Sequence, residues 1–457
     1  MESAVTVPES DSRQGNHHGQ RGPRGNAVNL AKELRRILRS VRWQRIHDFG
    51  PVEGVFPETD APVLDERANV DLAVLALDRK GELVDAANVV VTRDQPQGLI
   101  SDLDPNLGTK NITWQRWDQG QWDGNRAWIS SRRQLPAKDL IQTQKRLNGN
   151  AVFMSPYPAS LFKLPLAFFL LEDVSDQRIE LSDIRRDLRK MLTVSSNQAT
   201  QDLLKYLHEN DRIGAMNSRF RRLGLGTIQI KGTDSATGGG WKPGRITMTS
   251  MDTAKLLWLI QSDPSNPAPW SQPNGSPAQS KLTEQARRIL RNDLGNQAFN
   301  ETLSTANFGA ADINQKIKPP QYIEPGIPNH VPDRWIDNIT GFVTIESDGE
   351  RINFGEDVRP YNKKAASKNF LHKTGISYNF GSDAGIVEPS LGSIGARYII
   401  SFISNLGYRY IDEPFADRQS YPFEDNPGPI AHTQEIPRMG QRVNQLMDTH
   451  FNGDAGN

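Results

Sequence analysis

The sequence predicts an α+β protein, in which strands near both ends of the chain flank a long helical segment. Two strand-like runs occupy residues 70–77 and 83–92, and two more occupy residues 384–387 and 396–404. Residues 158–222 contain few glycines and many charged and aliphatic side chains, as packed helices do. No internal repeat with a period of roughly 20 to 50 residues is visible, which argues against a solenoid.

The N-terminal region predicts a polar tail followed by an amphipathic helix. Residues 1–27 are rich in Gly, Pro and Ser and contain no apolar run, so we expect disorder and no signal peptide. Residues 29–46 place aliphatic side chains at helical spacing opposite a basic face. These side chains are Leu30, Leu34, Ile37, Leu38 and Val41. Because the chain is neutral overall, we expect the basic face to contact solvent rather than a membrane.

Residues 70–92 predict an antiparallel hairpin. The runs VDLAVLAL and LVDAANVVVT are rich in aliphatic and β-branched residues, and the segment Asp78-Arg79-Lys80-Gly81 between them is a turn sequence. Near the other end of the chain, residues 437–451 predict a closing helix.

Two loop-rich stretches interrupt these elements. Residues 100–150 carry tryptophans in polar surroundings, which either bind a glycan or pack the loop onto the core, and we expect packing. The tryptophans are Trp114, Trp117, Trp122 and Trp128. Residues 262–279 are crowded with Pro, Ser and Asn and predict a surface insertion.

The composition narrows the available chemistry. The chain has 457 residues with 54 basic and 54 acidic side chains, so no net charge attracts nucleic acid. It contains no cysteine, which excludes disulfides, thiolate nucleophiles and Cys-ligated metals, and its 8 histidines lack metal-binding spacing. No apolar run approaches the roughly 18 to 20 residues of a membrane span. Any chemistry must use hydroxyls, amines, carboxylates or imidazole.

A serine and a lysine lie at helical spacing at the start of an apolar segment. Ser160 and Lys163 are three residues apart in PASLFK, so both occupy one face of the predicted helix. Unpaired N–H groups at a helix start favour a developing oxyanion, and a desolvated neutral lysine accepts a proton from serine. Alone, the pair is also compatible with a serine N-cap before an ordinary helix.

Two further motifs follow in order. The segment MLTVSSNQAT contains Ser195-Ser196-Asn197, which flanking apolar helical residues would carry toward the interior. The segment LHKTGI contains Lys373-Thr374-Gly375 at the start of the C-terminal strands, where glycine permits close approach to the backbone.

The ordered motifs S-x-x-K, S-x-N and K-T-G resemble the serine-reactive penicillin-recognising superfamily, and class A β-lactamases most closely. The surroundings are similar as well, from the hairpin at residue 70 to the final helix. The matching segments are RRDLRKMLTVSSNQATQDLLKYL, RLGLGTIQIKG, ITMTSMDTAKLL and ARYIISFIS.

The resemblance implies roles for the reacting groups. Ser160 would be the acylated nucleophile, and Lys163 would be the base that activates it. Ser195 would relay a proton to the departing ring nitrogen. The backbone N–H groups of Ser160 and Ile376 would form the oxyanion hole.

The resemblance also implies a substrate-binding set. Asn197 would hold the amide of the substrate side chain, while Lys373 and Thr374 would bind its carboxylate, and Lys373 would also set the potential at the proton relay. Gly375 would allow the close approach at the oxyanion hole. No cofactor or metal is implied.

The chain departs from the family in spacing and in its omega-like loop. Ser195 follows Ser160 by 195 − 160 = 35 residues, a short interval that implies trimmed helices or a lost loop in the helical domain. Ser196 stands where the family usually has aspartate. The hydrolytic Glu-x-x-Leu-Asn motif is missing from residues 231–245, where Asp234 is the one carboxylate. Asp234 would either activate water or cap a turn.

Three functions therefore stay open. The first is a class A-like β-lactamase, a serine hydrolase acting on a cyclic amide. The second is a penicillin-binding or esterase-like enzyme whose acyl-enzyme hydrolyses slowly, and the third is a non-catalytic binding relative. The expected partner is a small β-lactam or acyl-peptide-like molecule, with no nucleic acid, no membrane span and a monomeric state. The family favours the periplasm or secretion.

The resemblance implies a mostly antiparallel sheet flanked by helices, plus an all-helical domain from the middle of the chain. The predicted divisions are a tail (1–27), an N-terminal helix and linker (28–67), an α/β domain (68–157 with 340–457), a helical domain (158–261) and an insertion (262–339).

Overall fold

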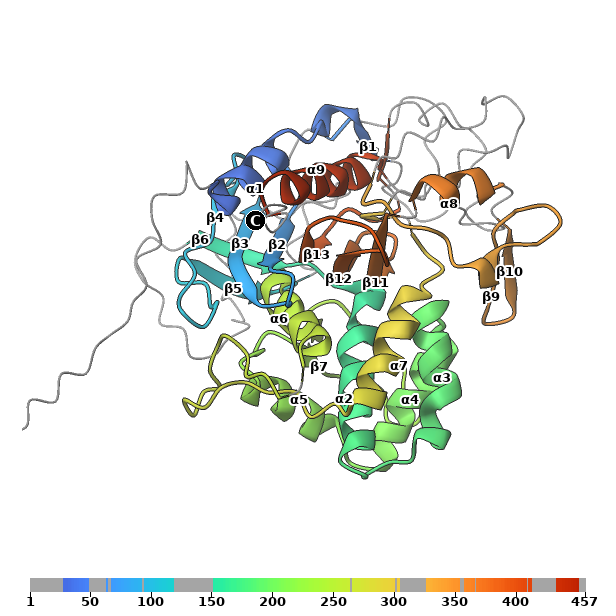
Figure 1. Ribbon diagram of the computed structural model, residues 1–457. Helices are drawn as coiled ribbons and strands as arrows, with labels where there is room; N and C mark the ends of the chain where they lie inside the picture. Colours follow the sequence, from blue (N-terminus) through green and yellow to red (C-terminus); the bar gives the residue numbers. More distant parts are fainter. Residues whose placement is uncertain are drawn as a thin grey trace, which may run out of the picture.

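The computed structural model confirms a mixed α+β fold (Figure 1). It describes residues 28–48, 63–64, 67–92, 94–118, 151–263, 265–300, 302–304, 326–353, 357–365, 367–408, 410–412 and 433–451. The predicted tail, Trp122 and Trp128 lie outside the described residues.

A six-stranded sheet forms the centre of the fold, and each neighbouring pair in it is antiparallel. In spatial order its strands are β11 (Lys368–Ile376), β12 (Gly381–Pro389), β13 (Arg397–Ser404), β2 (Val70–Leu77), β3 (Leu83–Val91) and β4 (Leu99–Ile100). The predicted hairpin is confirmed, because β2 pairs with β3. The pairing of β13 with β2 joins the two ends of the chain into one sheet.

The central strand β2 is apolar at every position except Asp71, because both of its faces are buried. Side chains alternate across a strand, so Ala73, Leu75 and Leu77 pack on the helical side of the sheet. Leu72 and Val74 point the other way, into a second core. The run VDLAVLAL therefore lacks the polar alternation of a solvent-facing strand.

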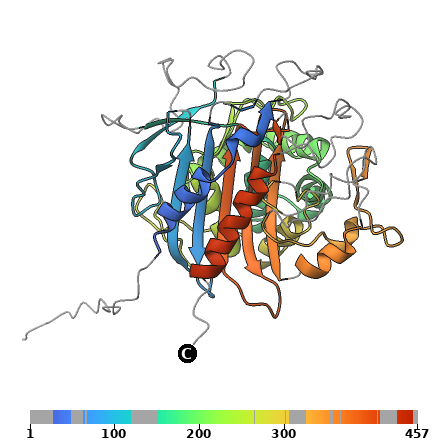
Figure 2. The same ribbon diagram turned by 90° about the horizontal axis from the view of Figure 1, so that it is seen from above.

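Two helices from the ends of the described chain cover the outer face of the sheet. They are α1 (Leu30–Arg39) and α9 (Glu435–His450), which cross it side by side in Figure 2. The Asn29 side chain caps α1 by accepting a 2.9 Å bond from the Lys32 N–H. The predicted N-terminal helix is shorter than expected, because the chain leaves the α-helix at Ser40 and makes a separate turn, η1 (Trp43–Arg45).

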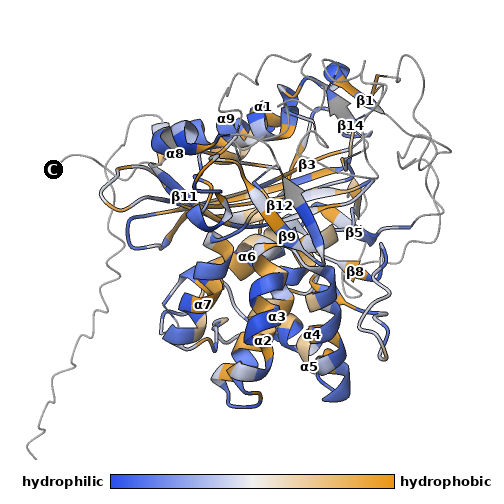
Figure 3. Ribbon diagram, turned by 90° about the vertical axis from the view of Figure 1, so that its right-hand side faces the viewer, coloured by the Kyte–Doolittle hydropathy of each residue, from blue (hydrophilic) through white to orange (hydrophobic). Residues whose placement is uncertain are grey.

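The opposite face of the sheet carries the helical domain (Figure 3). Its helices are α2 (Lys163–Ser175), α3 (Leu181–Thr193), α4 (Asn197–Glu209), α5 (Ile213–Arg222) and α7 (Glu284–Gly295). Helix α6 (Ser250–Gln261) is buried along almost its whole length, because it lies between the sheet and these helices. Among the described residues, no helix combines the length and the apolar character needed to cross a membrane.

One helix of the predicted insertion packs against the helical domain. Helix α7 falls in the range 262–339, yet Leu290 and Leu294 lie in the same core as the buried residues of α2. The proline-rich stretch before it is anchored too, because Trp270 stacks edge-on against Trp258 at 5.4 Å and donates a hydrogen bond to the Leu223 carbonyl. Residues 284–295 thus contribute to the same hydrophobic core as α2.

The remaining elements are short. They are β1 (Ile46–Asp48), β5 (Ile112–Arg116), β6 (Ala151–Ser155), η4 (Ala159–Phe162), β7 (Gln229–Ile230), β8 (Ile246–Thr247), η6 (Asp333–Trp335), β9 (Thr344–Ser347), β10 (Glu350–Asn353), α8 (Arg359–Ala365) and β14 (Tyr410–Asp412). The strands β5 and β6 pair in parallel. Packing of the tryptophan loop is confirmed for Trp114 and Trp117, which are buried against Phe153 and Phe380.

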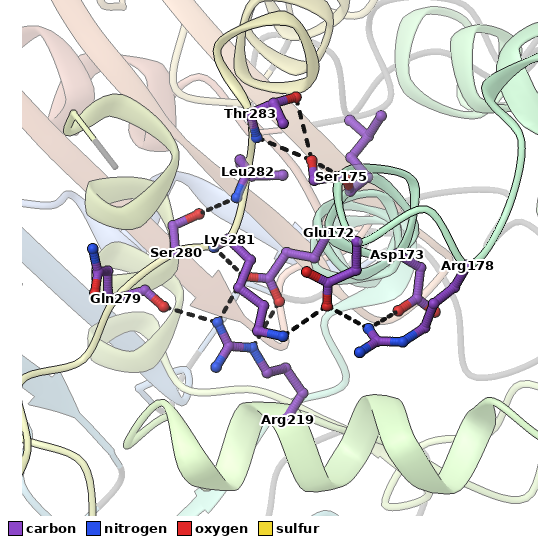
Figure 4. Close-up of polar contacts among 12 residues, drawn as sticks. Glu172, Asp173, Ser175, Arg178, Arg219, Gln279, Ser280, Lys281, Leu282 and Thr283 are labelled. Carbon is purple, nitrogen blue, oxygen red and sulfur yellow. Dashed lines mark hydrogen bonds and ion pairs between the residues drawn. The ribbon is translucent and has the colours of Figure 1, made fainter. Parts of the chain in front are cut away.

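Helix α2 is held at its C-terminal end by a buried charge network (Figure 4). Arg219 of α5 makes two bonds, of 2.7 and 2.8 Å, to the Glu172 carboxylate, and the Lys281 N–H donates a third. The neighbouring Asp173 accepts bonds from Arg178 and Arg212. Removing one partner of a buried pair typically costs about 3–5 kcal/mol, so the network fixes α2 against α5.

We predict that the buried carboxyl of Asp71 makes stability fall as pH rises. Desolvation raises the pKa of Asp71 to about 7, although the Ser250 N–H and the Asn88 amide donate to its carboxylate. Because the folded-state pKa exceeds the unfolded value, the contribution of Asp71 is full below about pH 4 and is lost as pH rises toward 7. In urea unfolding at pH 4 to 8, Asp71→Asn should gain stability relative to wild type as pH increases. Parallel pH curves for the two proteins would contradict this prediction.

Candidate active site

The predicted nucleophile Ser160 lies on a short 3-10 turn that leads directly into α2. The turn, η4, spans Ala159–Phe162, and α2 begins at Lys163. Ala159 has a φ of 45°, in the left-handed region, which typically costs a residue other than glycine about 1–2 kcal/mol. Ser160 itself is half-buried. The strained residue next to Ser160 marks this turn as a candidate for function rather than an ordinary helix start.

The Ser160 turn is docked on the strands that carry the K-T-G motif. The Ser382 hydroxyl of β12 donates to the Pro158 carbonyl at 2.6 Å and contacts the Gly375 carbonyl at 3.0 Å. A Cβ atom added to Gly375 would lie 2.4 Å from the Pro158 oxygen and 2.5 Å from the Leu161 nitrogen. Glycine is therefore required at position 375 for the Ser160 turn to approach β11 this closely. Room for a ligand at the same place would be a separate reason for glycine.

Both predicted lysines reach the hydroxyl of Ser195. Lys373 donates to Ser195 Oγ at 3.0 Å, and Lys163 lies 3.3 Å from the same oxygen. Lys163 also donates to the Ser195 carbonyl and, at 2.8 Å, to Asn197 Oδ1. Four of the predicted site residues, from α2, the α3–α4 turn and β11, thus form one hydrogen-bonded group.

The local sequence explains the shape of the α3–α4 turn. Ser195 has a φ of 56°, and Ser196 then caps α4 by accepting a 3.0 Å bond from the Ala199 N–H. The middle position of the S-x-N motif is therefore an N-cap serine. Asn197 is the first residue of α4 and is exposed, although its side chain accepts a hydrogen bond from Lys163 and its N–H donates one to Asp348.

The electrostatics of the site centre on Lys163. Its side chain and that of Lys373 are both fully buried. Burial lowers the pKa of Lys163 well below its ordinary value, repulsion by the Lys373 ammonium lowers it further, and attraction by Asp348 acts in the opposite direction. A lysine with a depressed pKa supplies a neutral amine near physiological pH, which is what a general base for a serine hydroxyl requires.

The other predicted binding residues lie along β11. Thr374 is buried and pairs with Asp383, and Ile376 is the last residue of the strand, opposite Gly381. Because β11 contacts η4 at Gly375, the backbones at Ser160 and Ile376 belong to the same docked pair of elements. This docking does not test the oxyanion hole formed by the N–H groups of Ser160 and Ile376, which stays a prediction.

Asp234 has the environment of a turn cap. The residue is exposed, and its carboxylate accepts bonds from the Ala236 N–H at 2.9 Å, the Thr237 N–H at 2.8 Å and the Thr237 hydroxyl at 3.1 Å. These hydrogen bonds, led by the one from the Thr237 backbone, lower the pKa of Asp234. A carboxylate held in this way is a weak base, which favours the capping alternative over water activation.

Two residues of the site were not found from the sequence. Trp241 lies with its ring 5.9 Å from Lys163 Nζ and edge-on to Phe162 at 5.2 Å, and its indole N–H donates to the Gly238 carbonyl. Asp348, from the turn between β9 and β10, accepts a hydrogen bond from the Ser196 hydroxyl. The sequence offered no chemical motif for either, although Trp241 does fall inside the omega-like loop.

Metal chemistry has no candidate centre within the part of the chain that the structure describes. No group of three or more His, Cys, Asp or Glu side chains is arranged there to hold an ion. Lys163, Lys373 and Ser195 are donors and acceptors of protons rather than ligands for a hard cation.

No protein-family model matches this sequence, and no curated protein matches it either. Among the solved structures to which the chain is similar are several β-lactamases and PBP-A. A β-lactamase from Xanthomonas campestris pv. campestris has 11% identity, with 92% of this chain and 100% of that chain covered and a TM-score of 0.41. A halotolerant bacterial β-lactamase has 13% identity, with 83% and 94% covered and a TM-score of 0.37. An acyl-enzyme complex of mutant PBP-A with penicillin G has 15% identity, with 66% and 88% covered and a TM-score of 0.35.

We predict that Gly375→Ala displaces the Ser160 turn. Overpacking of this kind typically costs about 1–3 kcal/mol, because the new methyl group meets backbone atoms that cannot move aside. Urea unfolding should show that loss. Gly214→Ala is the matched control, since a Cβ atom there meets nothing within 4 Å and the change lies in helix α5. Equal stability of wild type and Gly375→Ala would refute the close docking.

We also predict that Lys373→Met raises the pKa of Lys163. The substitution removes the like charge that disfavours the Lys163 ammonium, while burial of Lys163 is retained. NMR titration of isotopically labelled lysine side chains measures this value directly. Lys205→Met is the control, because Lys205 is an exposed residue of α4 paired with Glu209 at 3.8 Å. An unchanged Lys163 titration in Lys373→Met would show that the two ammonium groups do not interact.

Proposed function

We propose that this protein is a serine hydrolase that forms an acyl-enzyme at Ser160, with the cyclic amide of a β-lactam as acyl donor. The observation that supports this most directly is the single hydrogen-bonded group of Lys163, Ser195, Asn197 and Lys373 beside the docked Ser160 turn. A buried pair of lysines is costly without a chemical use, because each ammonium loses its hydration. The order of the three motifs supports the same class of reaction.

Acylation would proceed by proton transfer through this group. The neutral Lys163 amine takes the Ser160 hydroxyl proton as the oxygen attacks the carbonyl carbon, and the N–H groups of Ser160 and Ile376 stabilise the oxyanion. The carbon–nitrogen bond then breaks, and the departing nitrogen receives a proton through the Ser195 hydroxyl. Lys373 and Thr374 bind the substrate carboxylate, and Asn197 holds the side-chain amide.

Hydrolysis of the acyl-enzyme is the step that separates the two candidate functions. A class A-like β-lactamase needs a group that activates water next to the ester, and Asp234 is already committed to its own turn. The ring of Trp241 lies over Lys163, where it shields the amine from solvent. This contact favours the second candidate, a penicillin-binding or esterase-like enzyme with slow hydrolysis. Fast hydrolysis, if present, would use Lys163 again or another group as the base.

Acylation is tested by incubating the protein with a chromogenic β-lactam and measuring intact mass. We expect an adduct equal to the mass of the added β-lactam, located on the peptide that contains Ser160 and absent from Ser160→Ala. Ser182→Ala, which changes an exposed serine of α3, should label as wild type does. Steady colour formation supports the β-lactamase candidate, and a lasting adduct without turnover supports slow hydrolysis. An adduct that survives in Ser160→Ala would reject the assignment of the nucleophile.

A further inference from the structure

A hairpin from a distant part of the chain reaches the active-site turn. Strands β9 and β10 pair from Thr344 opposite Asn353 to Ser347 opposite Glu350, which leaves Asp348 and Gly349 as a two-residue turn. Their φ values of 52° and 89° are both positive, as a type I′ turn requires, and Asp-Gly is a favoured sequence for it. Turn geometry thus explains the residue types, but it does not explain where the carboxylate points.

The hairpin is fixed to the α3–α4 turn by apolar packing and by a hydrogen bond. Val343 and Ile345 are fully buried in a small core that also contains Val194, the residue just before Ser195. The Ser347 hydroxyl donates to the Val194 carbonyl at 3.0 Å. In Figure 1 the hairpin lies beside the end of the helical domain that is closest to the sheet. The position of the hairpin tip is therefore determined by the fold.

The Asp348 carboxylate occupies the N-terminus of α4. It accepts hydrogen bonds from the Ser196 hydroxyl, from the Asn197 N–H at 2.7 Å and from the Gln198 N–H at 3.4 Å. These N–H groups have no partner within the helix, and a carboxylate there is favoured by the helix dipole as well. The bonds fix the backbone that presents Ser195 and Asn197 to the lysines.

The Asp348 carboxylate also affects the pKa of Lys163. Two charged groups face Lys163, namely Lys373 from β11 and Asp348 from the hairpin, and the indole ring of Trp241 lies against it from the omega-like loop. Attraction by Asp348 raises the pKa of Lys163, against burial and against repulsion by Lys373. Asp348 therefore partly opposes the effects of burial and of Lys373 on Lys163.

We propose that Asp348 is a positioning residue of the active site, which holds the Ser196–Asn197 backbone and supplies negative charge to the group formed by Lys163, Ser195 and Lys373. The expected effect on acylation kinetics rests on the proposed function, acylation of Ser160. The expected effect on the Ser196–Asn197 backbone rests on the hairpin contacts alone. The hairpin that carries Asp348 therefore contributes to the active site as well as to the surface.

Two substitutions separate the charge of Asp348 from its hydrogen bonds. Asp348→Asn keeps an acceptor and a good type I′ turn but removes the charge, whereas Asp348→Gly removes the side chain without straining the turn. Asp337→Asn is the matched control. Asp337 also accepts hydrogen bonds within an exposed turn of the same region, from the Ile339 and Thr340 N–H groups, and it does not act on Lys163.

We expect different results for the two variants. In Asp348→Asn the acidic limb of the acylation pH profile should move to lower pH, because the neutral Lys163 amine forms more easily without the nearby carboxylate. In Asp348→Gly, hydrogen exchange at the amides of residues 197–199 should accelerate about tenfold or more, and acylation should slow by a similar factor, as expected for loss of charge-assisted bonds. Asp337→Asn should match wild type in both measurements.

The two measurements distinguish failure of this inference from failure of the proposed function. Wild-type acylation with an unchanged pH profile in Asp348→Asn and unchanged amide exchange in Asp348→Gly would overturn the role of Asp348. Accelerated exchange in Asp348→Gly, with no acylation of wild type at any pH, would retain the positioning role and reject the acyl-enzyme.

Discussion

The central constraint in this structure is that two buried lysine side chains share one serine hydroxyl. Like charges in a desolvated site repel each other strongly, so the arrangement persists only because other groups hold both lysines in place. Lys163 comes from the first turn of α2, Lys373 comes from an edge strand of the sheet, and Ser195 comes from the turn between α3 and α4. The two cores, one on each face of the sheet, fix these elements relative to one another.

Close backbone approach is the second requirement. The Ser160 turn sits directly on β11 because Gly375 has no side chain to prevent it, and Ser382 bridges the two backbones. Ala159, which precedes Ser160, and Ser195, which contacts both lysines, have left-handed φ values and are therefore strained. Such strain is tolerated where surrounding packing determines the conformation, and here the packing includes the Glu172 network that holds the far end of α2.

Segments between residues 262 and 353 help to position the site. Helix α7 completes the helical core, Trp270 anchors the proline-rich stretch, and the β9–β10 hairpin brings Asp348 to the start of α4. In the omega-like loop, the ring of Trp241 lies 5.9 Å from Lys163 Nζ. Under the proposed function, the lowered pKa of Lys163 would supply the neutral amine that acylation needs.

The sequence by itself determined the elements and the chemical groups. Largely apolar runs predicted β2 and β13, and helical spacing predicted α1. The order of three short motifs selected Ser160, Lys163, Ser195, Asn197 and Lys373. Local periodicity and residue type can be read from one sequence alone. It did not reveal that α7 belongs to the helical core, since a helix pattern does not say which surface it covers. Only the tertiary structure showed the contacts of Trp241 and Asp348, which lie 78 and 185 residues beyond Lys163 (241 − 163 and 348 − 163). Contacts over such separations depend on how the whole chain packs, and no local pattern records them.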